Sequence, residues 1–289
     1  MPPVLDLPIL DFDDARRVIA AALAEDTGSD KGGPGEDITS ASVIPADLRF
    51  KGVMQARHAM VVSGLPVAAE VFRMVVPESR FTPRAKDGET VAAGAVLAEM
   101  EGPARGLLTA ERTALNLLQL LSGIATLTRS YSERIEGTGC TLLDTRKTIP
   151  GLRRLSKYAT LCGGAKNHRM GLYDGVLIKD NHIAVCGGVG AAVRRAKEAG
   201  RPNVEAECDT LEQVAEAVAA GADIVLLDNM PPEVLRKAVA IVAGRCKTEA
   251  SGGVTLETIR AIAETGVDFV SVGRITQSAP AVDIGLDWS

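Results

Sequence analysis

Aromatic residues are scarce in this chain, and several other features are missing altogether. Because only 3% of the residues are aromatic, the core must consist mostly of Ala, Val, Leu and Ile. The five cysteines form no CxxC pair, which argues against a structural zinc site or a dithiol redox centre. Their wide spacing is typical of reduced thiols in a cytoplasmic protein. We therefore expect a cytoplasmic protein without a cysteine-based centre.

Signals for export and membrane insertion are also absent from the sequence. The first residues, MPPVLDLPILDFDD, are acidic and lack the basic start of a secretory signal. No apolar run approaches the length that spans a bilayer. The formal net charge of −5 argues against nucleic-acid binding, which normally needs a basic surface. We expect neither a membrane nor a nucleic acid as partner.

One stretch, residues 144–182, has a net positive charge although the whole chain is acidic. It carries eight Lys and Arg residues against three Asp, and it holds two of the three histidines. A concentrated cationic patch in an acidic protein usually binds a small polyanion. This segment is therefore the first candidate for a binding site.

The N-terminal part of the chain predicts a mixed α/β layer. Residues 11–25 have apolar side chains at the spacing of one helix face, and a Gly-rich polar loop follows at 26–37. Residues 43–101 predict short strands and hairpins, with one helix at 65–75. Leu and Ala surround the middle of 109–134, which predicts a long helix buried on most faces.

After residue 140 the pattern alternates between short apolar strands and amphipathic helices. The predicted strands cover 141–144, 175–179, 204–207, 223–228, 247–251 and 268–273. The predicted helices cover about 189–199, 211–220, 232–243 and 255–265. Such βα units form a parallel sheet, either closed into a barrel or open and doubly wound. We favour the barrel because polar residues follow nearly every strand, at the end where barrel enzymes place their chemistry.

Cations and carboxylates both occur at these strand ends. The cations are Arg146, Lys147, His168, Arg169 and Lys179, and the carboxylates are Glu207 and Asp228. Arg suits carboxylate or phosphate recognition, and a pair of carboxylates suits Mg²⁺ or ribose hydroxyls. By contrast, we expect Arg153, Arg154 and Lys157 to lie on a solvated helix face.

Two glycine-containing turns, 251–253 and 272–274, each lie between a strand and the next helix. Glycine allows the backbone to approach a ligand closely, and the loops after the last barrel strands commonly bind phosphate. Together the patterns predict a phosphorylated sugar that reacts with an anionic partner.

Two other functions fit the same residues. A barrel lyase could use Lys147 or Lys179 as a Schiff-base nucleophile, if crowding by Arg146 or Arg169 kept that lysine uncharged. A phosphate- or nucleotide-sensing module would need the cations but not the pair Glu207 and Asp228.

Seven segments occur in a specific order: GLLTAERTALNLLQLLSGIAT, LLDTRKTIPGLRRLSKYAT, GGAKNHRMGLYDGVLIKDNH, VEAECDT, IVLLDNM, EASGGV and VDFVSVG. In this order they closely resemble the quinolinate phosphoribosyltransferase family, from about residue 18 onward. The resemblance implies an N-terminal α/β sandwich followed by an incomplete parallel α/β barrel. We place the sandwich at 1–115, joined by the C-terminal tail 281–289, and the barrel at 116–280.

The resemblance also implies a reaction and a set of site residues. Quinolinate and phosphoribosyl pyrophosphate would give nicotinate mononucleotide, pyrophosphate and CO₂, with Mg²⁺ and no organic cofactor, in NAD synthesis. It implies a homodimer, or a higher oligomer, with shared active sites. The implied contacts to quinolinate are Arg146, His168, Arg169, Lys179 and, from the partner subunit, Arg112. Those to phosphoribosyl pyrophosphate and Mg²⁺ are Thr145, Lys147, Glu207, Asp228, Ser251, Gly252, Gly253, Val272 and Gly273, with Lys147, Glu207 and Asp228 as the catalytic residues. Arg274 follows this turn, and we expect it to add a contact to the phosphate.

The sequence departs from the family pattern in two places. Arg274 and Gln277 replace residues of the segment that commonly reads Ala-Leu-Thr-His-Ser, and the loop 29–36 is longer than expected. A paralogue of the same fold linked to molybdenum transport, with a different acid substrate, is a further alternative. The complete set of cations favours quinolinate.

Overall fold

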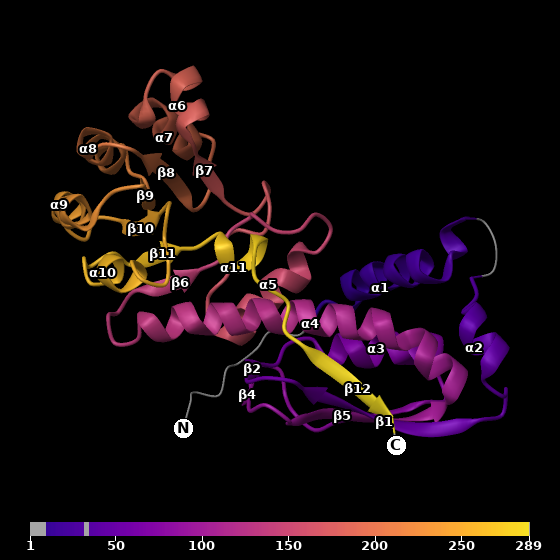
Figure 1. The fold of residues 1–289 in the computed structure, drawn as a ribbon. Helices are drawn as coiled ribbons and strands as arrows, with labels where there is room; N and C mark the ends of the chain where they lie inside the picture. The colour runs from indigo at the N-terminus through magenta and orange to yellow at the C-terminus, as the bar shows by residue number, and fades with distance from the viewer. Residues whose placement is uncertain (1–9, 32–34, 289) are drawn as a thin grey trace. The chain divides into compact units, whose positions relative to one another are not determined.

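The chain forms two compact units in a computed structural model that describes residues 10–31 and 35–288 (Figure 1). The first unit combines three segments, which are the chain up to Arg129, Ile149–Gly164 and the chain from Ser278 onward. The second unit combines Ser130–Thr148 and Ala165–Gln277.

This partition differs from the predicted boundary between residues 115 and 116. That boundary falls inside α4 (Ala104–Arg134), which continues without interruption because its residues have strong helix propensity. α4 also begins five residues before the helix that the apolar pattern predicted at 109–134. The loop expected at 29–36 begins with the 3-10 turn Ser29–Lys31, and residues 32–34 lie outside the described residues.

An antiparallel sheet forms one layer of the first unit. Its strand order is β12-β1-β5-β3, with β1 at Arg49–Ala56, β3 at Arg80–Pro83, β5 at Val96–Pro103 and β12 at Ile284–Trp288. A separate two-stranded sheet pairs β2 (Met60–Val61) with β4 (Thr90–Val91). The C-terminal strand β12 pairs with β1 at the edge of the larger sheet, so the end of the chain belongs to this unit.

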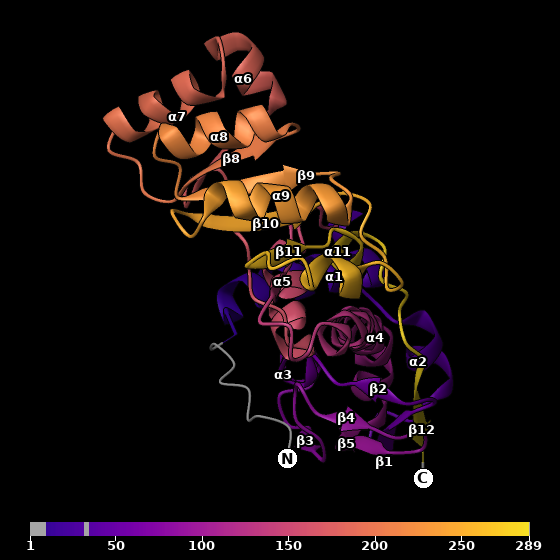
Figure 2. The same cartoon turned by 90° about the vertical axis from the view of Figure 1, so that its left-hand side faces the viewer.

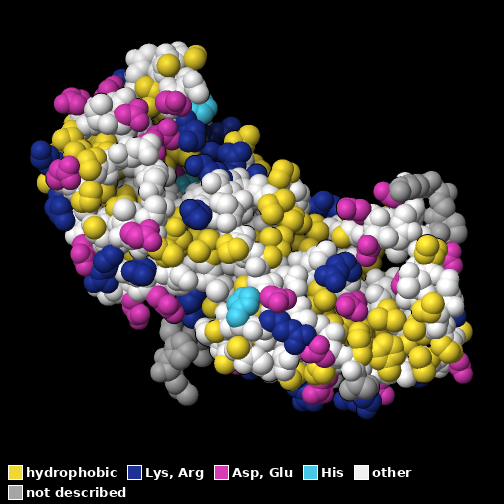
Figure 3. All heavy atoms as spheres, viewed as in Figure 1, with side chains coloured by type: hydrophobic (Ala, Val, Ile, Leu, Met, Phe, Trp, Pro, Cys, Tyr) yellow, Lys and Arg dark blue, Asp and Glu magenta, His cyan; other side chains and the backbone are white. Residues whose placement is uncertain are grey.

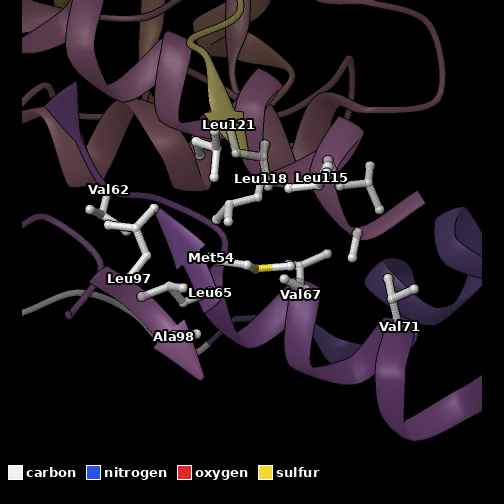
Figure 4. Close-up of a cluster of buried hydrophobic side chains, with 14 of the residues drawn as sticks. Met54, Val62, Leu65, Val67, Val71, Leu97, Ala98, Leu115, Leu118 and Leu121 are labelled. Carbon is white, nitrogen blue, oxygen red and sulfur yellow. The ribbon is translucent and has the colours of Figure 1, made fainter. Parts of the chain in front are cut away.

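Helices supply the other layer of the first unit. They are α1 (Phe12–Thr27), α2 (Ile38–Val43), α3 (Leu65–Val75), the first part of α4, and α5 (Arg153–Gly163). Asp11 caps α1, because its carboxylate accepts from the backbone N–H groups of the first turn. Between sheet and helices, Met54, Val67, Leu97 and Leu118 meet in an aliphatic core (Figure 4).

The predicted solvated position of Lys157 is wrong. Arg154 is exposed and pairs with Asp11 at 2.7 Å, as a surface residue does, but Lys157 has no exposed area. The reason is that α5 is buried around most of its circumference, so only a narrow part of the helix reaches solvent.

A six-stranded parallel sheet forms the centre of the second unit. Its order is β6-β11-β10-β9-β8-β7, with β6 at Thr141–Leu143, β7 at Val176–Ile178, β8 at Val204–Cys208, β9 at Ile224–Asp228, β10 at Lys247–Ser251 and β11 at Phe269–Ser271. The helices are α6 (Asp180–Cys186), α7 (Val189–Glu198), α8 (Leu211–Ala219), α9 (Pro232–Val242), α10 (Ile259–Ala263) and α11 (Arg274–Gln277).

The helices cover one face of this sheet, as in a barrel. Ala206 of β8, Val225 of β9 and Ala250 of β10 pack in one apolar cluster with α7, α8 and α9. Figure 2 shows these helices lying in turn beside β8, β9 and β10. In a doubly wound sheet the helices would divide between the two faces. The predicted fold class, an α/β sandwich domain and an incomplete parallel α/β barrel, is confirmed.

Candidate active site

The carboxyl ends of the parallel strands bring predicted site residues together in the second unit. Lys179 follows β7, Glu207 lies near the end of β8, and Asp228 ends β9. The Lys179 Nζ atom donates to Oε2 of Glu207 at 2.7 Å. Figure 3, viewed as Figure 1, shows Lys and Arg side chains gathered on this unit near β7.

Glu207 and Asp228 form a pair of acids on neighbouring strands. Burial, followed by the charge of Glu207, raises the pKa of Asp228 above its ordinary value. The Asn229 side chain, which donates to Oδ2 of Asp228 at 2.6 Å, and Lys179 act in the opposite direction. Two mutually repelling carboxylates with partly exposed oxygens are a donor set that suits a divalent cation.

The loops after β6 and β11 touch each other. The Thr276 hydroxyl donates to the Lys147 carbonyl at 2.7 Å, and the Lys147 N–H donates to the Thr145 hydroxyl oxygen at 3.0 Å. A Cβ atom at Gly273 would lie only 2.8 Å from Cδ of Lys147. A side chain at this position would push Lys147 aside, so glycine allows the turn that begins at Val272 to lie against the predicted catalytic lysine.

The loop after β10 lies against the end of β9. The backbone N–H of Asn229 donates to the Ser251 carbonyl at 2.8 Å, and a Cβ atom at Gly252 would collide with the Asn229 side chain. Gly252 and Gly253 both have left-handed φ angles, of 91° and 61°. Such a backbone is open to an approaching ligand, which fits the predicted phosphate loop.

Arg169 and Arg146 lie close enough to influence each other. Burial, and then the charge of Arg146, lowers the pKa of Arg169, although Glu205 and Asp174 act in the opposite direction. Arg169 Nη1 donates to the Gly175 carbonyl at 3.0 Å, which fixes the direction of the side chain. Two neighbouring guanidinium groups repel each other unless an anion lies between them.

His168 lies between two sets of acids. Its backbone N–H donates to Oδ1 of Asp144 at 2.9 Å, and Asn167 donates to Oδ2 of the same carboxylate at 2.7 Å. Its Nε2 atom lies 3.1 Å from Oε2 of Glu205 and 3.5 Å from Oε2 of Glu249. The chain's own groups therefore engage the ring, and its contact with a substrate stays a prediction.

Two predicted residues lie on helices. Arg112 is on α4 in the first unit, with an exposed side chain. Arg274 begins the short helix α11 and is also exposed. Their predicted roles stay predictions.

The sequence reading missed Glu205, Glu249 and Asn229. The two glutamates carried no distinct signal, because β8 (VEAEC) and β10 (KTEAS) both contain other polar residues. Asn229 adopts a left-handed φ of 52°, which its sequence position after Asp228 did not reveal.

Comparisons with known proteins identify one family over nearly the whole chain. Residues 37–122 match the model of the quinolinate phosphoribosyl transferase N-terminal domain, and residues 124–287 match that of the C-terminal domain. The chain is 43% identical to a nicotinate-nucleotide pyrophosphorylase [carboxylating] of Mycobacterium leprae, over 96% of this chain and 98% of that protein. It is also 43% identical to a probable nicotinate-nucleotide pyrophosphorylase [carboxylating] of Bacillus subtilis, over 87% of each chain.

A solved structure agrees with these sequence matches. The nicotinate-nucleotide pyrophosphorylase of Francisella tularensis superimposes with a TM-score of 0.91 at 40% identity, and all of each chain is covered. The chain belongs to the quinolinate phosphoribosyl transferase family.

Proposed function

We propose that this protein transfers the phosphoribosyl group of phosphoribosyl pyrophosphate to quinolinate and removes CO₂, giving nicotinate mononucleotide and pyrophosphate in NAD synthesis. The observation that carries the proposal is the convergence of cations from separate βα loops beside a pair of acids. Arg146 and Arg169 influence each other electrostatically, and Lys179 bonds to Glu207. The names of the relatives give the same reaction class.

Quinolinate is a dianion, and its two carboxylates require paired cations. Burying them unpaired would cost several kcal/mol per charge. In our proposal Arg146, Arg169 and Lys179 hold these carboxylates, with His168 beside them. The repulsion between the two arginines is relieved when an anion binds, which favours the charged substrate over a neutral pyridine.

The glycine loops bind the 5-phosphate of the second substrate in this proposal. Ser251 ends β10 and is followed by Gly252 and Gly253, and Val272, Gly273 and Arg274 follow β11. Thr145 and Lys147 contact the latter turn and lie beside the phosphoribosyl group. Backbone N–H groups and a lysine ammonium together are well suited to phosphate oxygens.

Glu207 and Asp228 act on the ribose. Loss of pyrophosphate leaves positive charge on C1, and these two carboxylates stabilise it. They are also the residues that would hold Mg²⁺, because they are neighbouring carboxylates that repel each other. Mg²⁺, when bound, neutralises the leaving pyrophosphate.

The pyridine nitrogen attacks C1 and becomes positively charged. The adjacent carboxylate then leaves as CO₂, its bonding electrons remain on the ring carbon, and that carbon takes up a proton. The ring nitrogen itself stabilises the electron pair. This sequence needs neither a covalent enzyme intermediate nor an organic cofactor.

A direct assay tests the proposal. Purified protein is incubated with phosphoribosyl pyrophosphate, Mg²⁺ and quinolinate, and nicotinate mononucleotide is measured by a coupled reaction. We expect product from quinolinate and none above background from nicotinate, which lacks the second carboxylate. Product from nicotinate alone would contradict the proposal.

The two alternative functions have separate tests. A Schiff-base lysine must be uncharged, but Lys179 donates to the Glu207 carboxylate. Borohydride with a keto substrate should therefore trap no adduct. A sensing module would release no pyrophosphate even in its wild-type form, whereas we expect release that Glu207→Ala and Asp228→Ala each abolish.

We also propose a homodimer in which Arg112 completes the partner's site. Ile38 and Val43 on α2 are exposed large hydrophobic residues, as at a surface that a second copy could cover. Mixing Arg112→Ala subunits with Arg169→Ala subunits should restore up to about a quarter of the activity, because one site in four regains both arginines. No recovery in verified mixed dimers would exclude the shared site.

The proposed compartment is the cytoplasm. All five cysteines are free thiols, which fits a reducing environment. Among the described residues no helix combines the length and apolar character needed to cross a bilayer.

A further inference from the structure

Two glutamates that the proposed reaction does not use lie inside the barrel next to His168. Glu205 on β8 is 3% exposed, and Glu249 on β10 is 1% exposed. Their strand neighbours Ala206 and Ala250 pack towards the helices. Because side chains alternate along a strand, both glutamates point to the inside of the barrel. Side chains from alternate strands share a layer there, which explains how they meet.

Three of the four oxygens of these two carboxyl groups lack a hydrogen-bond donor in the described part of the chain. If both are ionised, neither oxygen of Glu249 nor Oε1 of Glu205 has a hydrogen-bond partner within the described residues. The Ser271 hydroxyl is near Glu249 but does not reach hydrogen-bond geometry. Two buried carboxylates without donors are strongly unfavourable, whereas a proton on one of them provides a donor for the other.

A metal ion is the other way to neutralise such a group. The ligand atoms of His168, Glu205 and Glu249 all lie within 4.8 Å of one another. However, Nδ1 of His168 accepts the backbone N–H of Arg169 at 2.7 Å. Nδ1 therefore carries the lone pair and Nε2 carries the hydrogen, so the nitrogen that faces the glutamates has no lone pair for a metal. The geometry favours a proton.

We propose that Glu249 carries a proton and donates it in a hydrogen bond to Glu205, and that Glu205 accepts the Nε2–H of His168 and so fixes the imidazole ring. Both glutamates are positioning residues. They act through His168 on the turn that carries Arg169.

The surroundings of Glu249 favour the protonated form. Burial, followed by the charge of Glu205, raises the pKa of Glu249 to about 8, and the opposing effect of His168 does not offset this. The other neighbouring groups are Arg169, whose charge acts on Glu205, and the Cys140 thiol, whose pKa the charge of Glu249 helps to raise. No cation of the described residues bonds directly to Glu249.

The ring position matters because His168 holds Arg169 at its backbone. The Arg169 N–H donates to the ring, and Arg169 Nη1 donates to the Gly175 carbonyl. Rotation of the ring would remove the first of these bonds and release one end of the arginine. The effect on catalysis rests on the proposed function, but the proton on Glu249 does not.

Infrared spectroscopy tests the proton directly. The spectrum of wild-type protein near neutral pH should contain a band of an un-ionised carboxyl that is missing in Glu249→Gln. The matched control is Glu70→Gln, which removes another buried glutamate but should keep the band, because arginines surround Glu70. Identical spectra for wild type and Glu249→Gln would overturn the proposal.

Nitrogen NMR tests the histidine. The chain has three histidines, so ¹⁵N-histidine labelling gives a simple spectrum in which a His168→Gln variant assigns the signal. We expect the Nε2–H tautomer at neutral pH, unchanged by a chelator or by added Zn²⁺. The Nδ1–H tautomer, or a shift with Zn²⁺, would overturn the proposal in favour of another arrangement or of a metal site.

Kinetics test the positioning role. Glu205→Leu should raise the KM for quinolinate about tenfold with a smaller effect on kcat. Glu205→Gln should keep a KM close to that of wild type, because its side-chain carbonyl still accepts the Nε2–H of His168. The wild-type KM should rise above about pH 8, and Glu249→Gln should remove that rise. Equal losses in both Glu205 variants, or the same pH curve in Glu249→Gln, would overturn the role. If quinolinate is not the substrate, the infrared and NMR results still decide the proton on Glu249.

Discussion

Each unit buries a glutamate, and the two are stabilised in opposite ways. Glu70 in the first unit is 6% exposed and accepts from Arg16 and Arg73, both at 2.6 Å. The Arg73 bond, supported by Arg16, lowers the pKa of Glu70 to about 2 despite burial, whereas the pKa of Glu249 in the barrel is raised to about 8.

The difference extends to other charged groups of the second unit. In the barrel Arg146 lies near Arg169, Glu207 near Asp228, and Glu205 near Glu249. A fold gains nothing in stability by bringing like charges together. Such crowding is therefore a sign that a ligand, or a proton in the case of Glu205 and Glu249, supplies the missing charge, and it separates the working half of this chain from the supporting half.

The largest effect should come from removing a cation of the crowded pair. We expect Arg169→Ala to lower kcat/KM for quinolinate about 100- to 1000-fold, because a charge-assisted contact to a carboxylate is lost. Calorimetry should show the same loss in quinolinate affinity. The control is Arg260→Ala, which breaks a surface pair with Glu264 and two bonds to the Arg134 and Glu136 carbonyls, and which should leave quinolinate affinity unchanged. Unaltered quinolinate affinity in Arg169→Ala would show that the crowded arginines of the second unit do not bind the substrate.

A smaller effect is expected at Glu70, whose negative charge is balanced by two arginines. Glu70→Gln should destabilise the protein by about 1–2 kcal/mol at neutral pH, since both arginine partners are half exposed and solvent screens them. Because the pKa of Glu70 is lowered, its contribution is present above about pH 4.5 and disappears as the pH falls towards 2. Urea unfolding at several pH values measures it. An equal loss at low and neutral pH would contradict the ion-pair explanation.

The pH dependence should have the opposite sign at Glu249. A raised pKa means that the folded protein binds the extra proton, so this stabilisation is complete below about pH 4.5 and is lost as the pH rises towards 8. Glu249→Gln should lack this loss, so its Tm relative to wild type should increase by several degrees from acidic to alkaline pH. A constant difference in Tm across this range would show that folding does not raise the pKa of Glu249.

The smallest effect should come from a solvated pair. Arg84 follows β3 and Glu99 lies on β5 of the first unit, and they form an ion pair at 2.8 Å with both side chains about half exposed. We expect Arg84→Ala to change stability by less than about 0.5 kcal/mol and to leave quinolinate turnover unchanged. A larger loss in urea unfolding would mean that the first unit depends on surface charge pairs as well as on Glu70.

The repeating part of the fold was predictable from sequence because each βα unit has its own apolar period. The strand predicted at 247–251 matches β10, and the helix predicted at 189–199 differs from α7 by one residue. Elements without such a period were missed. The short helices α2 and α6 have too few residues to display one, and α10 is shorter than its pattern because residues 255–258 form a turn.

The site could be predicted only as far as the strand ends. Residues such as Lys179 and Asp228 follow apolar strands, and parallel geometry brings such positions together. Glu205 lies two residues earlier than Glu207 and gives the same alternating pattern, so sequence alone could not separate the buried acid from the one at the rim. Lys157 was misplaced for a related reason, because a lysine does not show how completely its helix is enclosed.

The pairing of β12 with β1 has a consequence for biosynthesis. During translation β1 emerges early, whereas Ile284–Trp288 emerges after the entire barrel. Until then one edge of the larger sheet offers unpaired backbone groups to any other extended chain. The ribosome therefore delivers a nearly complete catalytic half before the supporting half can close, and in that interval a chaperone would have the most to protect.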